Sequence, residues 1–166
     1  MRRGKKDKKT RGSGDPVPHL TLGLEALERS EAIYLLVGGI AMNLHGLSRA
    51  TKDIDVLIPK DYENTKKLLK GLENLGFGIA REMEPEEVLS KPFTIIGDVP
   101  RVDLLLRAGK LRFEEAYPNR MTRVINGIRV SYVSLDDLIK SKQTGRLKDK
   151  IEIKAIQKIK NHNRAK

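Results

Sequence analysis

The chain has 166 residues, which is enough for one domain with a tail. It contains no cysteine, so disulfides, cysteine-ligated metal centres and thiol catalysis are excluded. Aromatic residues make up 4% and tryptophan is absent, which argues against a stacking platform for single-stranded nucleic acid. The formal net charge of +11 is concentrated at the ends, because residues 1–14 carry +6, residues 140–166 carry +8 and residues 15–139 carry −3. Such segregation fits a polyanionic partner, or equally a solubilising tail and the solvated face of a helix.

Residues 1–18 combine charge, glycine and proline with almost nothing apolar, which predicts a disordered basic tail before one domain over residues 19–166. The tail could contact the backbone of a nucleic acid, or be a targeting or expression remnant. No apolar run approaches the ~20 residues that span a bilayer, and no apolar segment follows the basic N-terminus as in a signal peptide. We therefore expect a cytoplasmic protein without membrane association.

The first part of the chain alternates apolar runs with turn residues, which predicts helices and strands in mixed order. Helices are expected over residues 20–30, 40–47 and 61–74. Strands are expected over residues 33–37, 53–58, 77–80, 93–96 and 102–106.

The second part begins with the strongest short hairpin signal, Asn126-Gly127 between β-rich runs over residues 121–125 and 128–133. Ser134 can cap a helix whose first turn is acidic. A long helix over residues 146–160 is expected to bury four apolar residues, Ile151, Ala155, Ile156 and Ile159. The mixture, with at least one antiparallel pair, indicates the α/β or α+β class.

Val37-Gly38-Gly39 is a strand that runs into a glycine turn and then a helix. Backbone N–H groups at such a turn can face phosphate oxygens, and small residues let a phosphate approach the backbone closely. A tight strand-to-helix turn without a ligand is the commoner explanation of a glycine pair. The glycine pair indicates a phosphate-binding turn only in combination with the acidic residues that follow.

Asp53 and Asp55 are two residues apart in a predicted strand, so both side chains point to the same face. Adjacent carboxylates repel each other, and Mg²⁺, which binds a few carboxylates with waters and substrate phosphates, would relieve the repulsion. Ile54 and Val56 supply the opposite, apolar face, so the carboxylates could open into a cleft. A solvated strand face or a helix-capping aspartate would explain the pair as well.

Asp103 lies inside an apolar run and needs a partner if it is buried: a metal, a neighbouring arginine (Arg101 or Arg107), or solvent at the strand end. Together with the glycine turn and the paired carboxylates, it makes a set suited to metal-assisted phosphoryl transfer. One or two Mg²⁺ ions at Asp53 and Asp55 would bind a nucleoside triphosphate. Asp103 could complete a second metal site or accept the proton of the attacking hydroxyl.

These motifs resemble the minimal nucleotidyltransferase superfamily, whose pattern is a hydrophobic residue and two small residues, an Asp-x-Asp strand, and a third acidic residue on a later strand. The stretch from Gly38 to Asp55, with His45, Gly46, Arg49 and Thr51, further resembles small members related to AbiEii-type toxins. The segment Lys142…Gly145-Arg146…Lys148-Asp149 resembles their C-terminal Lys and Arg-x-Lys-Asp motif.

The resemblance covers roughly residues 30–160 and implies a polymerase-β-like palm, a mixed sheet flanked by helices. It implies transfer of a nucleoside monophosphate from a nucleoside triphosphate with Mg²⁺. The implied metal and catalytic carboxylates are Asp53, Asp55 and Asp103. The implied nucleotide-binding residues are Gly38, Gly39, Arg49, Lys142, Arg146 and Asp149.

The sequence departs from the family pattern at two positions. Many members have serine where Gly39 stands, and Glu152 replaces an aspartate that usually follows the first C-terminal aspartate. Two local ambiguities accompany them: Arg49 could bind phosphate or neutralise the paired aspartates, and Lys142 and Arg146 could share a helix face toward a phosphate or lie on a solvated basic helix.

The leading hypothesis is therefore a Mg²⁺-dependent nucleotidyltransferase with an unknown acceptor: RNA such as tRNA, a protein or a small molecule. A role in a toxin–antitoxin pair, with an antitoxin as partner protein, would follow from the family analogy. The alternative is a catalytically inactive nucleic-acid-binding module on the same fold, with basic ends that bind RNA. A third hypothesis is a scaffold that uses the fold only for association.

Overall fold

The computed structural model describes residues 20–165 of the chain. The expectation for the tail over residues 1–18 lies outside the described residues. Helices and strands follow one another in this order: α1 (Thr21–Arg29), β1 (Leu35–Val37), α2 (Gly38–Leu44), β2 (Asp53–Leu57), α3 (Tyr62–Asn74), η2 (Gly78–Glu82), α4 (Pro85–Leu89), β3 (Phe93–Ile96), β4 (Arg101–Leu105), α5 (Phe113–Ala116), η3 (Tyr117–Asn119), β5 (Met121–Ile125), β6 (Ile128–Tyr132), α6 (Leu135–Ser141) and α7 (Leu147–Arg164).

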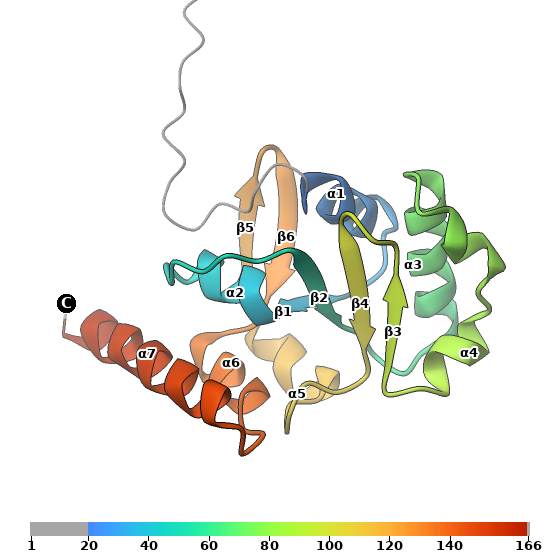
Figure 1. Ribbon diagram of the computed structural model, residues 1–166. Helices are drawn as coiled ribbons and strands as arrows, with labels where there is room; N and C mark the ends of the chain where they lie inside the picture. Colours follow the sequence, from blue (N-terminus) through green and yellow to red (C-terminus); the bar gives the residue numbers. More distant parts are fainter. Residues whose placement is uncertain (1–19, 166) are drawn as a thin grey trace, which may run out of the picture.

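A six-stranded mixed sheet in the order β3-β4-β2-β1-β6-β5 forms the centre of the molecule (Figure 1). β1 is antiparallel to β2 and parallel to β6, while β2 is parallel to β4. The two outer strands, β3 and β5, are each antiparallel to their neighbours. The expected α/β class with a mixed sheet flanked by helices is confirmed.

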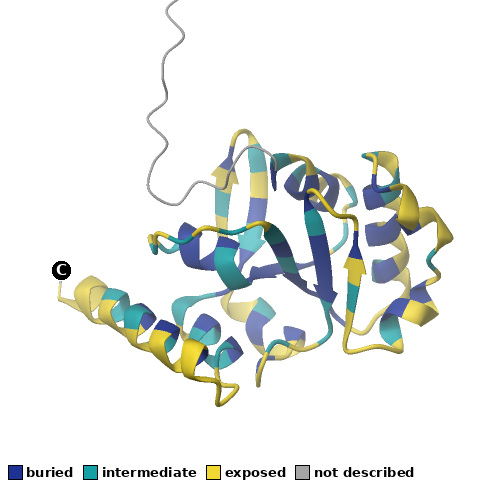
Figure 2. Ribbon diagram, in the orientation of Figure 1, coloured by how far each residue is buried: buried dark blue, intermediate teal, exposed yellow. Residues whose placement is uncertain are grey.

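Two hydrophobic clusters lie on opposite faces of the sheet, as the alternation of side chains along a strand requires. Ile54 and Val56 of β2 face the cluster that contains the leucines of α1 and α3. Leu57, on the other face, belongs to the cluster that α2, α5, α6 and α7 complete. Figure 2 shows buried residues along the inner faces of these helices. The aspartates of β2 share the face of Leu57.

Local signals explain several element boundaries. The Ser134 hydroxyl accepts a hydrogen bond from the backbone N–H of Asp137 at 3.2 Å, so the expected cap of α6 is present. Asn126 and Gly127 have φ of 50° and 80°, the left-handed conformations that a two-residue hairpin turn needs. The hairpin β5–β6 is therefore formed as predicted.

The predicted strand over residues 77–80 is wrong. Gly78–Glu82 form a 3-10 helix, because the N–H of Ala80 donates to the Phe77 carbonyl at 2.9 Å and the segment satisfies its own backbone. The short helices α4 and α5 have no strong periodic signal and were not predicted. The strand expected from residue 33 begins only at Leu35, since Ile33 is exposed and its N–H donates to Asn64 of α3.

The predicted burial along the last helix is also partly wrong. Ile151 is 60% exposed, and the buried residues of α7 are Asp149, Glu152 and Ile156. Two of these three are carboxylates, so an apolar pattern could not reveal the buried face. The helix also runs on to Arg164, beyond the expected end.

Candidate active site

The glycine turn lies directly against the paired carboxylates. β1 ends at Val37, which is paired with Asp55 of β2, and α2 starts at the next residue. Gly38 has a φ of 64°, and a Cβ atom there would lie 2.2 Å from Asp55 Oδ2. A Cβ atom on Gly39 would lie 2.9 Å from Thr51 Oγ1. The backbone at both glycines therefore approaches its neighbours more closely than any other residue would allow.

The close approach at Gly39 explains the first departure from the family pattern. The Thr51 side chain fills the space that a side chain at position 39 would need. The Thr51 hydroxyl also accepts a hydrogen bond from the Asp53 N–H at 3.3 Å, which orders the entry into β2. A serine at position 39 would require Thr51 to move.

The three candidate carboxylates lie on one face of the sheet. β2 and β4 are parallel and in register, so that Asp55 is opposite Asp103 and Asp53 is opposite Arg101. Asp103 is buried, whereas Asp53 and Asp55 are partly exposed. The sequence argument that the aspartates of β2 face away from Ile54 is confirmed.

Crowding changes the protonation of Asp55. Its burial, together with the negative charges of Asp103 and Asp53, raises the pKa to about 6, while Lys142 and Arg101 act in the opposite direction. The carboxylate is thus short of positive charge at neutral pH. This is the electrostatic situation that a bound cation relieves.

Arg101 is the partner of Asp103. Its Nε lies 2.9 Å from Asp103 Oδ1 and its Nη2 lies 2.8 Å from Oδ2, so the guanidinium holds both carboxylate oxygens. The same Nε is 3.6 Å from Asp53 Oδ2. Of the partners considered for Asp103, the structure has Arg101, and Arg107 donates instead to the Gly109 carbonyl.

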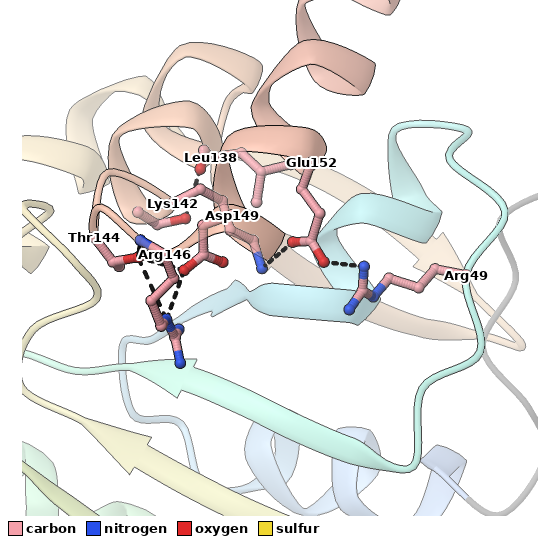
Figure 3. Close-up of polar contacts among 8 residues, drawn as sticks. Arg49, Leu138, Lys142, Thr144, Arg146, Asp149 and Glu152 are labelled. Atoms are coloured by element: carbon pink, nitrogen blue, oxygen red, sulfur yellow. Dashed lines mark hydrogen bonds and ion pairs between the residues drawn. The ribbon is translucent and has the colours of Figure 1, made fainter.

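The C-terminal motif forms a second polar cluster where α6 meets α7 (Figure 3). Lys142 directly follows α6 and Arg146 directly precedes α7, so the two residues do not share one helix face. Lys142 Nζ lies 2.7 Å from Glu152 Oε2, and Arg146 Nε donates to Asp149 Oδ2 at 2.9 Å. Each cation has its own buried carboxylate.

Arg49 joins this cluster rather than the paired aspartates. Its guanidinium donates to Glu152, which thereby receives one cation from the segment before β2 and another from α6. Glu152, the second departure from the family pattern, is 5% exposed. Its ion pairs attach Arg49, before β2, and Lys142, after α6, to α7. Although burial works against it, hydrogen bonds from Thr144 and Arg146 keep the pKa of Asp149 below its ordinary value.

A cavity of about 230 Å³ connects the glycine turn with the C-terminal motif. Gly38 lies in its wall, together with the cationic side chains of Arg107, Lys142 and Arg146. Three cations beside a glycine turn suit a polyphosphate. Sequence reasoning did not assign Arg107 or Thr144 to this cavity, since neither belongs to a motif. A larger groove of about 510 Å³ lies between α3 and the segment from η2 to the start of α4, and it includes no candidate site residue.

Two of the three candidate carboxylates are open to a divalent cation. Among residues 20–165, no group of three or more His, Asp or Glu side chains is arranged to hold a metal ion. Asp103 is bound by Arg101, which leaves Asp53 and Asp55 as the pair open to a cation. Two carboxylates with a shortage of positive charge fit the chemistry of Mg²⁺, which takes its other ligands from water and phosphate.

Residues 21–163 match the family described as nucleotidyltransferase of unknown function (DUF6036). The chain belongs to this family. It is a nucleotidyltransferase, an enzyme class that acts on nucleotides and generally uses divalent metals. No curated protein matches the chain.

A solved structure shares the fold. The crystal structure of the lincosamide antibiotic adenylyltransferase LnuA with bound lincomycin superposes with a TM-score of 0.54 at 17% sequence identity. The match covers 88% of this chain and 99% of that one. The expected nucleotidyltransferase fold is thus confirmed. In the described part of the chain, no helix combines the length and apolar character needed to cross a membrane.

Proposed function

We propose that this family member transfers a nucleoside monophosphate from a nucleoside triphosphate to an acceptor, with Mg²⁺ at Asp53 and Asp55. One observation carries the proposal: Gly38 lies against the carboxylate of Asp55 and also lines the cationic cavity, so the glycine turn joins the aspartates of β2 to the cations of the cavity. A triphosphate in the cavity would contact Arg107, Lys142 and Arg146, and its α-phosphate would lie toward the carboxylates.

The reaction is an in-line substitution at the α-phosphorus. The oxygen of an acceptor hydroxyl forms a bond to this phosphorus and releases its proton to water, the bond to the bridging oxygen of the β-phosphate breaks, and pyrophosphate leaves. When bound, Mg²⁺ would neutralise charge on the phosphate oxygens. Asp53 and Asp55 would hold the cation, and Asp103 is the third carboxylate of the site. The Gly38-Gly39 backbone leaves room for the phosphates, and Lys142 and Arg146 stabilise the charge on the leaving pyrophosphate.

Asp149, Arg49 and Glu152 position these cations. Asp149 orients the Arg146 guanidinium, and Glu152, which also pairs with Arg49, holds Lys142. Lys142 and Arg146 of the C-terminal motif line the same cavity as Gly38, which supports the AbiEii-type relationship that this motif suggests.

RNA such as tRNA is our candidate acceptor. Lys150, Lys154 and Lys158 are exposed at four-residue spacing on α7, whose first turn borders the cavity at Arg146. A row of like charges on one helix face is unfavourable by itself and favourable beside a phosphate backbone. If the RNA is essential to the cell, the protein would act as a toxin with an antitoxin partner. The name of LnuA describes an antibiotic as its substrate. A small molecule is therefore the second acceptor to test.

Calorimetric titration with a non-hydrolysable nucleoside triphosphate, with and without Mg²⁺, tests the proposal. Binding should require Mg²⁺ and be lost in Asp53→Asn/Asp55→Asn, but persist in Asp98→Asn, a matched exposed aspartate before β4. Labelled nucleotide with tRNA, protein extract or small hydroxyl compounds then identifies the acceptor. No nucleotide binding by the wild-type protein would contradict the proposal.

The second candidate is a non-catalytic RNA-binding module. The Arg101–Asp103 pair favours it, because a neutralised third carboxylate also suits a site that has lost its metal. Salt-dependent RNA binding without any affinity for nucleoside triphosphate would support this candidate. A stable complex with a partner protein that forms equally well without Mg²⁺ would support the scaffold hypothesis.

A further inference from the structure

The four side chains at the N-terminal ends of β2 and β4 form a two-by-two arrangement. Asp53 is opposite Arg101 and Asp55 is opposite Asp103, with all four side chains on the same face of the sheet. Three positions carry a carboxylate and the fourth carries a guanidinium. Arg101 therefore belongs to the site by position, two residues before Asp103 on the same strand.

The contacts of Arg101 are directed at the carboxylates. It donates to both oxygens of Asp103, at 2.9 and 2.8 Å, and lies 3.6 Å from an oxygen of Asp53. The Asp103 side chain is only 11% exposed, so its oxygens have little access to water or to ions from solution. Displacing the guanidinium would leave a buried carboxylate without a partner, which is costly.

The charge of the site favours one divalent cation over two. Three carboxylates and one guanidinium leave a net charge of −2 at the site when all are ionised. One divalent cation neutralises this charge, whereas a second would have to compete with Arg101 for Asp103. Lys142 is left out of this charge count, because it pairs with Glu152.

We propose that Arg101 is a positioning residue that takes the place of a second metal ion. It fixes Asp103 and limits the site to one divalent cation, held by Asp53 and Asp55. This inference rests on the proposed function, because it concerns the metal content of the same site. Asp103 then acts through Arg101, as the anchor of a permanent positive charge beside the phosphates, and is neither a metal ligand nor a proton acceptor.

A titration with Mn²⁺, followed by electron paramagnetic resonance of the free ion, tests the stoichiometry without any assay of turnover. We expect one ion per wild-type chain. Arg101→Met, which keeps the aliphatic stem, should bind a second ion or bind the first about tenfold more tightly, because the site gains one negative charge. Arg81→Met, which removes an exposed arginine from its pair with Glu73 in a groove without any candidate site residue, should leave the titration unchanged.

The charge-conserving double variant Arg101→Met/Asp103→Asn is the sharper test, since it also avoids the three unpaired carboxylates that could unfold the single variant. It should again bind one ion, within about threefold of the wild-type affinity, because the two removed charges cancel and Arg101 makes only a longer contact of 3.6 Å with Asp53. Two ions on the wild-type chain, or a large loss of affinity in the double variant, would overturn the inference. No ion on the wild-type chain, or unchanged binding in Asp53→Asn/Asp55→Asn, would instead overturn the proposed function.

Discussion

Gly38 packs its backbone against the carboxylate of Asp55, so that a Cβ atom at position 38 would lie 2.2 Å from Oδ2. The contact joins the end of β1 to the middle of β2 and brings the turn next to the paired aspartates. Glycine is required twice here, for the left-handed φ of 64° and for the close approach.

The first prediction follows from this contact. Gly38→Ala should lower the free energy of unfolding by more than the ~1–3 kcal/mol of backbone strain alone, and weaken nucleotide binding at least about tenfold, because Asp55 must move. Gly46→Ala is the matched control: φ is 93° there, but no atom lies within 4 Å of the added Cβ. Equal effects of the two substitutions in urea unfolding and nucleotide titration would show that the contact with Asp55 is unimportant.

Removing the charge of Asp55 should stabilise the metal-free protein. Burial and the neighbouring carboxylates raise its pKa to about 6 in the folded state, above the ordinary 3.8, so ionisation opposes folding. The wild-type protein should therefore lose stability relative to Asp55→Asn as the pH rises from about 4 to about 6. At pH 7 the variant should be more stable by about 1–3 kcal/mol.

Urea unfolding in the presence of EDTA at pH 4 and pH 7 measures this difference. Added Mg²⁺ should raise the stability of the wild-type protein and leave Asp55→Asn unchanged, since only an ionised pair binds the cation. A variant less stable than wild type at pH 7 would mean that the carboxylate is fully compensated by its surroundings.

Much of the site was predictable because its signals are local. The alternation of Ile54 and Val56 with the two aspartates requires only the period of a strand, and the structure confirms which face each residue occupies. The same rule puts Arg101 on the face of Asp103, so the arginine could have been assigned to the site from its spacing alone.

The C-terminal helix shows what remained beyond prediction. Its buried face carries Asp149 and Glu152, which are tolerated inside only because Arg146, Lys142 and Arg49 pair with them. Arg49 is 103 residues away from Glu152 in the sequence. A hydrophobic pattern along one helix carries no information on such a distant partner. It therefore predicted burial of Ile151 rather than of the two carboxylates.

The register of α7 gives a stability prediction. Ile156 is fully buried, whereas Ile151 is 60% exposed. Ile156→Ala should cost about 2–5 kcal/mol in the free energy of unfolding, and Ile151→Ala should change it by no more than about 0.5 kcal/mol. Similar losses for the two substitutions in chemical unfolding would place the helix in a different rotation about its axis.

Glu152 should matter for both stability and nucleotide binding. Glu152→Gln keeps the shape of the side chain but leaves Lys142 and Arg49 without their shared carboxylate, which we expect to cost about 2–4 kcal/mol of stability because the group is 5% exposed. Lys142 would then be free to turn toward Asp55 and neutralise it. The affinity for Mg²⁺ should fall as a result, even where the variant is fully folded.

Glu73→Gln, in an exposed pair with Arg81, is the control for the loss of a surface ion pair, and it should alter neither property. Urea unfolding measures the loss of stability. Mg²⁺ titration without urea, at a temperature low enough for the variant to be folded, measures the change in Mg²⁺ affinity. Unchanged Mg²⁺ affinity in folded Glu152→Gln would mean that Lys142 is held in place without Glu152. The cation would then depend on the turn between α6 and α7 for its position, and the buried carboxylate would serve only to attach Arg49 to α7.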